Sequence, residues 1–179
     1  SNATAGVALE MDEGNRLGGG HAAIHVIPAA LAVAEERGAT GKEFLESVIA
    51  AYEVTSRIGT GTKVRKAVHS HGTWGTIGSA VATAKLMGFD GAHTREAINV
   101  AASMSPATTW APCSEGASIR NLSLGRPGFQ GIMAAHLTLC GFTGLEDAPS
   151  AIYNTILGDP FHPEAVVQEL GVPGAYLIQ

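Results

Sequence analysis

One stretch of the chain decides the fold: Gly72-Thr-Trp-Gly-Thr-Ile-Gly-Ser-Ala-Val-Ala-Thr-Ala-Lys-Leu-Met-Gly88. Its interior consists of small and apolar residues, and Lys85 is its only charged side chain. A helix that is apolar on every side is surrounded by protein rather than by water. The stretch therefore predicts a buried central helix over Thr73–Met87, against which other elements pack.

Glycine pairs mark the joints between the predicted helices, at Gly38–Gly41, Gly88–Gly91 and Gly141–Gly144. Glycine suits the left-handed backbone position just after a helix, and Thr or Asp then caps the next helix. Thr40 with Glu43 has the spacing of a capping box, and Thr143 with Glu146 repeats that spacing. These signals predict short connections from one helix to the next.

Apolar spacing between the joints predicts the remaining helices, which cover Val26–Arg37, Lys42–Ile58, Thr94–Ser103, Leu124–Cys140 and Pro163–Leu170. The segment Pro106–Ser118 has no clean period and is predicted to be a loop. No alternating run is long enough for a sheet, so the predicted fold is an all-α, multi-helix bundle.

Two of the predicted helices carry rows of small residues. Glycine inside a helix costs up to about 1 kcal/mol relative to alanine, so a row of glycines needs a compensating contact. Close approach of the two helices would supply it, and the rows are Gly75, Gly78, Ser79 and Ala82 on one helix and Gly125, Gly128, Gly131, Ala134 and Ala135 on the other.

Composition bounds the class of protein. The chain has 179 residues, of which 45% are hydrophobic and 15% charged, which fits a single folded domain and is too interrupted for a membrane span. The net charge of −5 argues against a nucleic-acid surface. Residues 1–3 are interpreted as an expression-tag remnant, which leaves residues 4–179 as one domain, incomplete at its N-terminus.

The two cysteines, Cys113 and Cys140, form no metal-ligand spacing and no disulfide framework. This usage favours a reduced, cytoplasmic setting. Neither cysteine is expected to have a nearby base, so thiol catalysis is not predicted.

An acidic run followed by glycines and a histidine is the first candidate for chemistry. Glu10-Met-Asp12-Glu13 precedes Gly18-Gly-Gly-His21, which can supply a proton acceptor and a carboxylate that orients it. A solvated acidic loop with a histidine at a helix entry is the alternative. A metal site of Asp12, His21, His25 and His69 is a further alternative, although no tight ligand motif supports it.

Cations and histidines just before the central helix form the second candidate, Lys63-Val-Arg-Lys66-Ala-Val-His69-Ser-His71. Lysine and arginine attract carboxylates or phosphates, and histidine titrates near neutrality, so the cluster predicts a site for a small anion. His69 and His71 lie two residues apart and are expected to point in different directions unless the backbone bends. Two exposed histidines on a basic loop are the alternative.

Arg120, in the segment Glu115–Asn121, is the third candidate. Its guanidinium has the geometry of a two-pronged clamp for a carboxylate. A structural salt bridge explains this residue equally well.

At the level of whole segments the chain resembles the MmgE/PrpD family, which includes 2-methylcitrate dehydratase and cis-aconitate decarboxylase. The segments that carry the resemblance are Gly72–Gly88, Val26–Glu35, Ala51–Gly59 and Cys140–Gly144. The resemblance implies a large all-α domain, which in the family is joined to a smaller α/β lid domain absent from this chain. It also implies homodimers formed through the helical domain, and catalysis without a metal or an organic cofactor.

The same resemblance assigns roles to particular residues. The family's acidic segment and its histidine fall on Asp12 and His21, and its second active-site histidine falls on His69. A family lysine falls on Arg120, which keeps the charge but is a poor proton donor. We therefore expect Asp12, His21 and His69 to be catalytic, and Arg120, Lys63, Lys66 and His71 to bind substrate.

These assignments favour a lyase, specifically a dehydratase that acts on a small hydroxy di- or tricarboxylic acid by histidine-mediated proton transfer. A decarboxylase or an epimerase of related acids is the alternative within the fold. A non-catalytic helical scaffold, or one part of a split enzyme whose lid is a separate chain, is the alternative outside it. The expected partners are thus a polycarboxylate, a second copy of the chain and a lid-bearing chain, with no nucleic acid and no membrane.

Overall fold

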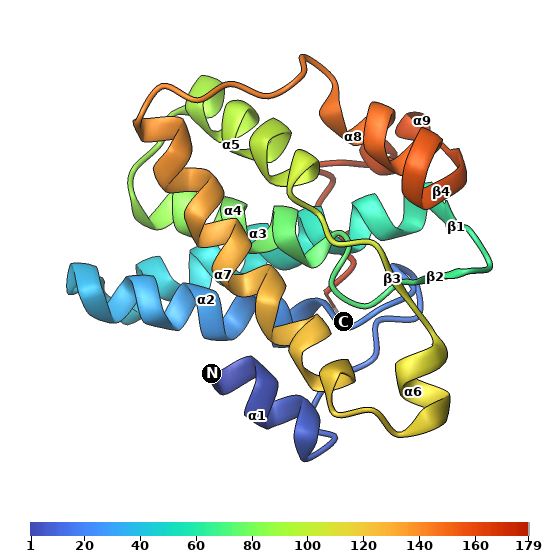
Figure 1. Cartoon of the computed structure of the whole chain (residues 1–179). Coiled ribbons are helices and arrows are strands. Elements are labelled where there is room, and N and C mark those ends of the chain that lie inside the picture. The colour runs from blue at the N-terminus through green and yellow to red at the C-terminus, as the bar shows by residue number, and fades with distance from the viewer. Residues whose placement is uncertain (179) are drawn as a thin grey trace.

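Helix α4 (Gly75–Leu86) runs through the middle of the molecule. A computed structural model describes residues 1–178, and the predicted domain end at Gln179 lies outside the described residues. Every residue from Gly75 to Ala84 is buried, which confirms the predicted central helix. Four long helices pack against it, namely α2 (Ala22–Arg37), α3 (Gly41–Gly61), α5 (Gly91–Ser103) and α7 (Ile119–Leu139) (Figure 1).

Shorter elements surround this core. The helical ones are α1 (Asn2–Ala8), α6 (Ala111–Glu115), α8 (Ala148–Ile152), the π-helical turn η1 (Tyr153–Leu157) and α9 (Pro163–Val167). Two antiparallel ladders join β1 (Thr62–Val64) to β4 (Gly158–Phe161) and β2 (Val68–His69) to β3 (Thr108–Thr109). Within residues 1–178, no helix combines the length and the apolarity needed to cross a membrane.

The predicted helices agree with the observed ones to within a few residues, except that α7 begins at Ile119 rather than at Leu124. The fold is mostly helical, as predicted. The predicted loop Pro106–Ser118 is wrong in part, because it contains β3 and α6. Elements of this length cannot show a sequence period. Asn2 and Ala3, assigned to the tag remnant from sequence, lie in α1, where Ala3 is buried.

The glycine joints end their helices as predicted. Gly38, Gly88 and Gly141 have φ angles of 63°, 75° and 85°. At each joint the next amide donates to a carbonyl in the last helical turn, as Ala39 does to Ala34 at 2.9 Å. The Thr40–Glu43 capping box is confirmed, since both of its reciprocal hydrogen bonds are present.

The second predicted capping box, Thr143 with Glu146, is wrong. Helix α8 begins only at Ala148, and Asp147 caps it. The segment before it is held along α5 instead: the Gly144 amide donates to Glu96 Oε1 at 2.6 Å. In addition, the Asn99 side chain donates to the Glu146 carbonyl at 3.2 Å. These long-range bonds replace the local cap.

The small-residue rows allow helices to approach closely, as predicted. They do so with more partner helices than the one predicted pair. A Cβ atom on Gly131 of α7 would lie 2.6 Å from both the Ala80 nitrogen and the Thr76 oxygen of α4. The predicted contact between the two helices is therefore present. On α4, however, Gly75 faces the His25 ring of α2, and Gly78 faces Thr55 of α3. The two rows thus do not face each other along their length, because α4 uses its glycines against other helices.

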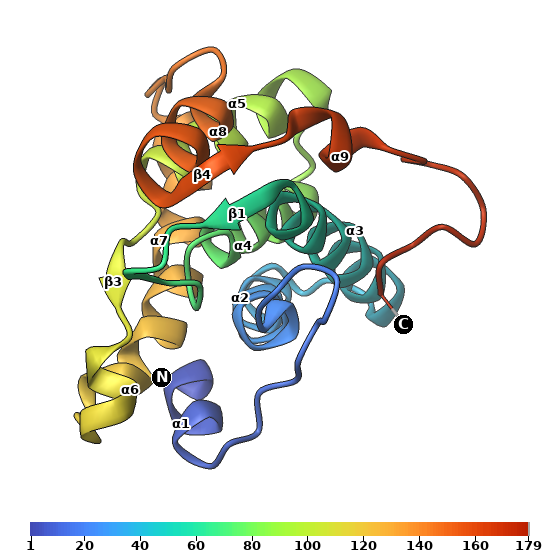
Figure 2. The same cartoon turned by 90° about the vertical axis from the view of Figure 1, so that its right-hand side faces the viewer.

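A buried ion pair on α3 holds the end of the described chain, which runs past that helix (Figure 2). Arg57 Nε donates to Glu53 Oε1 at 2.7 Å, and both side chains are buried. Arg57 Nη1 also donates to the Gln168 carbonyl at 2.6 Å, and the Leu177 amide donates to Glu53 Oε2 at 2.7 Å. Each member of the pair thus bonds the main chain of residues 168–177.

We predict that Gly131→Ala destabilises the fold by about 1–3 kcal/mol, because the added methyl group must push α7 away from α4. Denaturant unfolding of the purified protein measures this difference. Gly91→Ala at the start of α5 is the matched control, since a Cβ there meets nothing within 4 Å. Equal stability of the two variants would contradict the close approach.

Candidate active site

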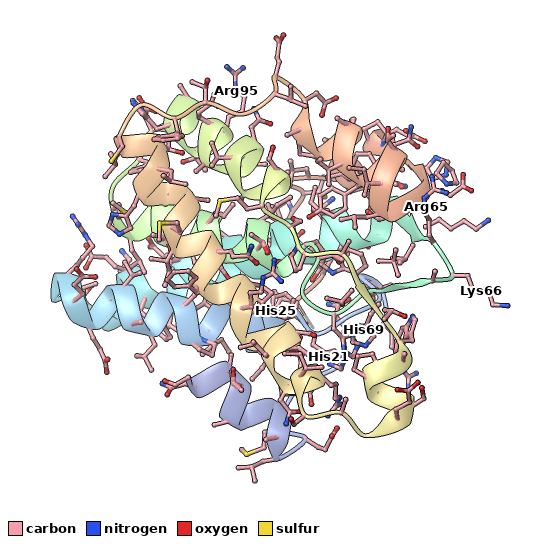
Figure 3. All side chains as sticks on the ribbon, viewed as in Figure 1. His21, His25, Arg65, Lys66, His69 and Arg95 are labelled. Carbon is pink, nitrogen blue, oxygen red and sulfur yellow. The ribbon has the colours of Figure 1, made fainter. Side chains whose placement is uncertain are left out.

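Three histidines meet at one end of the bundle. The His71 ring lies 4.0 Å from the His21 ring and 4.0 Å from the His69 ring, measured between centroids. His21 caps α2, His69 ends β2, and His71 lies in the turn before α4. Figure 3 shows His21 and His69 close together beneath the core.

A backbone bend brings the two neighbouring histidines to the same place. β2 pairs with β3, and the chain then turns at Ser70, whose carbonyl accepts bonds from the Thr73 amide and from the Thr73 hydroxyl at 2.6 Å. Gly72 in this turn has a φ of 90°, which favours glycine. The exception stated for His69 and His71 therefore holds: the backbone bends between them, and the bend brings the second side chain to the first.

A main-chain carbonyl and a carboxylate define the orientation of His21. Its Nδ1 lies 2.5 Å from the Glu13 carbonyl oxygen and 3.6 Å from Asp12 Oδ2, and the Asp12 side chain is only 5% exposed. A carbonyl can only accept, so Nδ1 carries the proton and Nε2 of the neutral ring is free to take one. Glu13 in turn accepts from the Ala23 amide at 2.8 Å, and burial raises the pKa of its carboxyl group.

Burial keeps the other two histidines uncharged at neutral pH. It lowers the pKa of His69 to about 4, and the nearby Arg120 charge adds to the effect. It also lowers the pKa of His71 to about 3, with further repulsion from His21 and His69. Within residues 1–178, the buried Nδ1 of His71 has no hydrogen-bond partner.

His69 has two neighbours that the sequence did not indicate. Its Nε2 lies 3.3 Å from Cys113 Sγ of α6, and the Trp110 ring meets it edge-on at a centroid distance of 4.1 Å. The expectation that neither cysteine has a base nearby is therefore wrong for Cys113. Pairing of β2 with β3 creates this contact between residues 44 positions apart, and no local pattern reveals it.

Arg120 clamps a carboxylate, and that carboxylate belongs to the chain itself. Its Nη1 lies 2.5 Å from Glu10 Oε1 and its Nη2 lies 3.2 Å from Glu10 Oε2. Beside this pair lies an open hollow of about 520 Å³. Its wall is formed by Ala8, Glu10, Pro112, Cys113, Gly116, Ala117, Ser118, Arg120 and Asn121.

Lys63 and Lys66, which were expected to bind substrate, do not lie beside the histidine cluster. Lys63 is exposed on β1, which pairs with β4 on a different ladder. Lys66 is exposed and extends away from His21 and His69 (Figure 3). Arg65 between them donates to the carbonyls of Thr155 and Ile156, so it supports η1. The structure therefore separates Lys63 and Lys66 from the cluster of Asp12, His21, His69 and His71.

The metal arrangement considered from sequence is not assembled. Within residues 1–178, no group of three or more His, Cys, Asp and Glu side chains has the geometry to hold a metal ion. His25 is 2% exposed, packs against Gly75 and donates from Nδ1 to the Leu124 carbonyl at 2.9 Å. It joins α2 to α7 in the core.

Comparison with protein families identifies the helical domain. A family model described as the MmgE/PrpD N-terminal domain matches residues 1–155. The chain belongs to the MmgE/PrpD N-terminal domain family. This confirms the resemblance seen in the sequence, and the family is linked to dehydratase-like enzymes. A search of curated proteins returned no match.

The MmgE/PrpD match covers the whole of the histidine cluster and Arg120. The match ends inside η1. The main-chain groups that Arg57 bonds therefore lie beyond the match. The candidate site therefore lies entirely within the family domain.

Acid should destabilise the fold through the neutral histidines. The ordinary pKa of histidine is 6.5, whereas burial lowers the pKa of His25 and of His69 to about 4 and that of His71 to about 3. Below pH 6.5 the unfolded chain therefore binds protons that the fold excludes, and the free energy of unfolding falls as the pH drops toward 4.

We predict that His71→Gln reduces this loss by up to about 1.4 kcal/mol per pH unit, the limit for one proton. Denaturant unfolding between pH 7 and about pH 4.5 measures it. His136→Gln, on an exposed position of α7, should leave the slope unchanged. A His71→Gln slope equal to that of the parent protein would contradict the neutral, buried state of this ring.

Proposed function

We propose that the protein is a lyase, a dehydratase that removes water from a small hydroxy di- or tricarboxylic acid. The observation that carries the proposal is the cluster of His21, His69 and His71 behind a hollow whose wall contains Arg120. Cys113 lies between the histidine cluster and the hollow, since it lines the hollow and contacts His69. Membership of a family linked to dehydratase-like enzymes supports the same reaction type.

His21 is the proposed proton acceptor. Its Nδ1–H is directed to the Glu13 carbonyl, which leaves Nε2 to accept a proton from the substrate carbon. The resulting imidazolium would lie beside the Asp12 carboxylate, 3.6 Å away, which stabilises the positive charge. The Nε2 atom of His69 instead faces Cys113 Sγ at 3.3 Å. The Asp12 pairing therefore favours His21 over His69 for this role.

Arg120 is the proposed anchor for a substrate carboxylate. Removal of a proton next to a carboxylate builds negative charge in the transition state, and a fixed cation stabilises it. The guanidinium already holds a carboxylate in two-pronged geometry, that of Glu10. The Glu10 side chain is 69% exposed, so it can move into solvent when a substrate takes its place.

The activity test follows the appearance of the unsaturated acid by proton NMR, with citrate-like hydroxy acids as substrates and the protein at its natural length. We expect His21→Gln to reduce kcat by about 10²–10⁴-fold, the usual loss of a positioned acid–base group. His136→Gln on the exposed face of α7 should retain the parent rate. Absence of turnover across the panel, or an unchanged rate in His21→Gln, would refute the dehydratase.

The same assay separates the related reactions. A decarboxylase of these acids would release carbon dioxide from the substrate. An epimerase would exchange the hydrogen on the substrate carbon with solvent deuterium without forming a double bond. Either outcome would replace the dehydratase while keeping His21 and Arg120 in their roles.

Glu10→Gln should strengthen carboxylate binding, because an uncharged amide competes less well for Arg120. We expect citrate to raise the melting temperature of this variant more than that of the parent protein, and not to raise that of Arg120→Gln. A melting temperature that no di- or tricarboxylate shifts in any of these proteins would favour a non-catalytic scaffold.

A further inference from the structure

A cysteine lies at the boundary between the histidine cluster and the hollow. Cys113 Sγ lies 3.3 Å from His69 Nε2, within the range for a hydrogen bond that involves sulfur. The same residue forms part of the wall of the hollow of about 520 Å³. A thiol with a base on one side and open space on the other is arranged for nucleophilic attack.

The surroundings of His69 suit it to take the thiol proton. Its side chain is 1% exposed, and Trp110 covers it edge-on at 4.1 Å. Its Nε2 faces the sulfur at 3.3 Å, so the neutral ring is placed to accept the thiol proton as the sulfur attacks. Cys113 is its closest polar contact among the described residues.

A positive charge adjoins the same sulfur. The Arg120 guanidinium, which is paired with Glu10, lines the same hollow as Cys113. A fixed cation in the wall of the hollow attracts anionic reagents and carboxylates toward the sulfur. The Glu10 carboxylate neutralises part of the Arg120 charge, and the rings of His69 and His71 are uncharged at neutral pH.

We propose that Cys113 is a nucleophilic thiol that gives its proton to His69 and adds to small α,β-unsaturated carboxylic acids held by Arg120. The choice of an unsaturated acid rests on the proposed dehydration, whose product has that structure. The reactivity of the thiol does not depend on it, because it follows from the contacts of Cys113 alone.

The addition is balanced without a further reactant. The thiol proton moves to His69 Nε2, and the sulfur electron pair forms a bond to the β-carbon of the acid. The electron pair of the carbon–carbon double bond moves toward the carboxylate, where Arg120 stabilises the charge. The proton on His69 is then delivered to the α-carbon, which gives a thioether and restores the neutral ring.

Alkylation with iodoacetate and with iodoacetamide tests the nucleophile, and the chain supplies its own control in the exposed Cys140. Each reagent forms a sulfur–carbon bond and releases iodide, and peptide mass spectrometry measures the rate at each cysteine. We expect Cys113 to prefer the anionic reagent by about tenfold relative to Cys140, since the cation lies beside only one of the two thiols. An equal ratio of the two rates at both cysteines would overturn the proposed carboxylate selectivity.

Two variants assign the effect to its causes. His69→Gln should slow both reagents at Cys113 about tenfold, because the thiol proton has no acceptor, and Arg120→Gln should abolish only the preference for iodoacetate. The Cys140 rate should not change in either variant, and the circular dichroism spectrum of each variant reports whether the fold is retained. Unchanged Cys113 rates in His69→Gln would overturn the role of the histidine.

Incubation with maleate tests the class of electrophile. We expect a stable maleate adduct at Cys113 and none at Cys140, whereas absence of the adduct would overturn the assigned class. The result is independent of the proposed function, since a protein that forms the adduct but turns over no hydroxy acid would retain the thiol and refute the dehydratase.

Discussion

The close approach of helix backbones around α4 is the constraint on which the rest of the structure depends. Gly131 lets α7 come against Thr76 and Ala80, and Gly78 lets α3 come against the same helix from another side. At the N-terminal end of α4 the His25 ring packs on Gly75 and also bonds the Leu124 carbonyl, which ties α2 to α7. The first turns of α2, α4 and α7 are therefore held together.

This convergence determines where the polar groups of the site lie. His21 caps α2, His71 precedes α4, and Arg120 lies in the first turn of α7. Each comes from the start of a helix, where the unpaired amides give the helix a partial positive charge. A place where three such ends meet favours anions, and it agrees with the resting occupation of Arg120 by the Glu10 carboxylate.

The sequence predicted what depends on local chemistry. The uncharged run that forms α4, the left-handed glycines and the Thr40–Glu43 cap are properties of neighbouring residues, and the structure confirms them. Family membership follows from segments of the same kind. His21 and His69, named from the sequence, lie in one cluster, although their catalytic roles remain predictions.

The errors have one physical origin, which is contact between distant residues. Thr143 fails as a cap because Glu96 and Asn99 hold the adjoining segment along α5. The contact of Cys113 with His69 needs the β2–β3 ladder, and Glu10 reaches Arg120 across 110 positions. Lys63 and Lys66 stand next to the histidines in sequence, yet Lys63 lies on β1, which pairs with β4, and Lys66 extends away from the histidines (Figure 3).

The buried ion pair of Arg57 and Glu53 on α3 affects which substitutions the chain tolerates. Arg57 and Glu53 bond only carbonyl and amide groups of residues 166–177, and every residue except proline carries both groups. The ion pair therefore holds the backbone of this segment, whichever side chains the segment carries. Substitutions along this segment can accumulate without releasing it, as long as the backbone keeps its course.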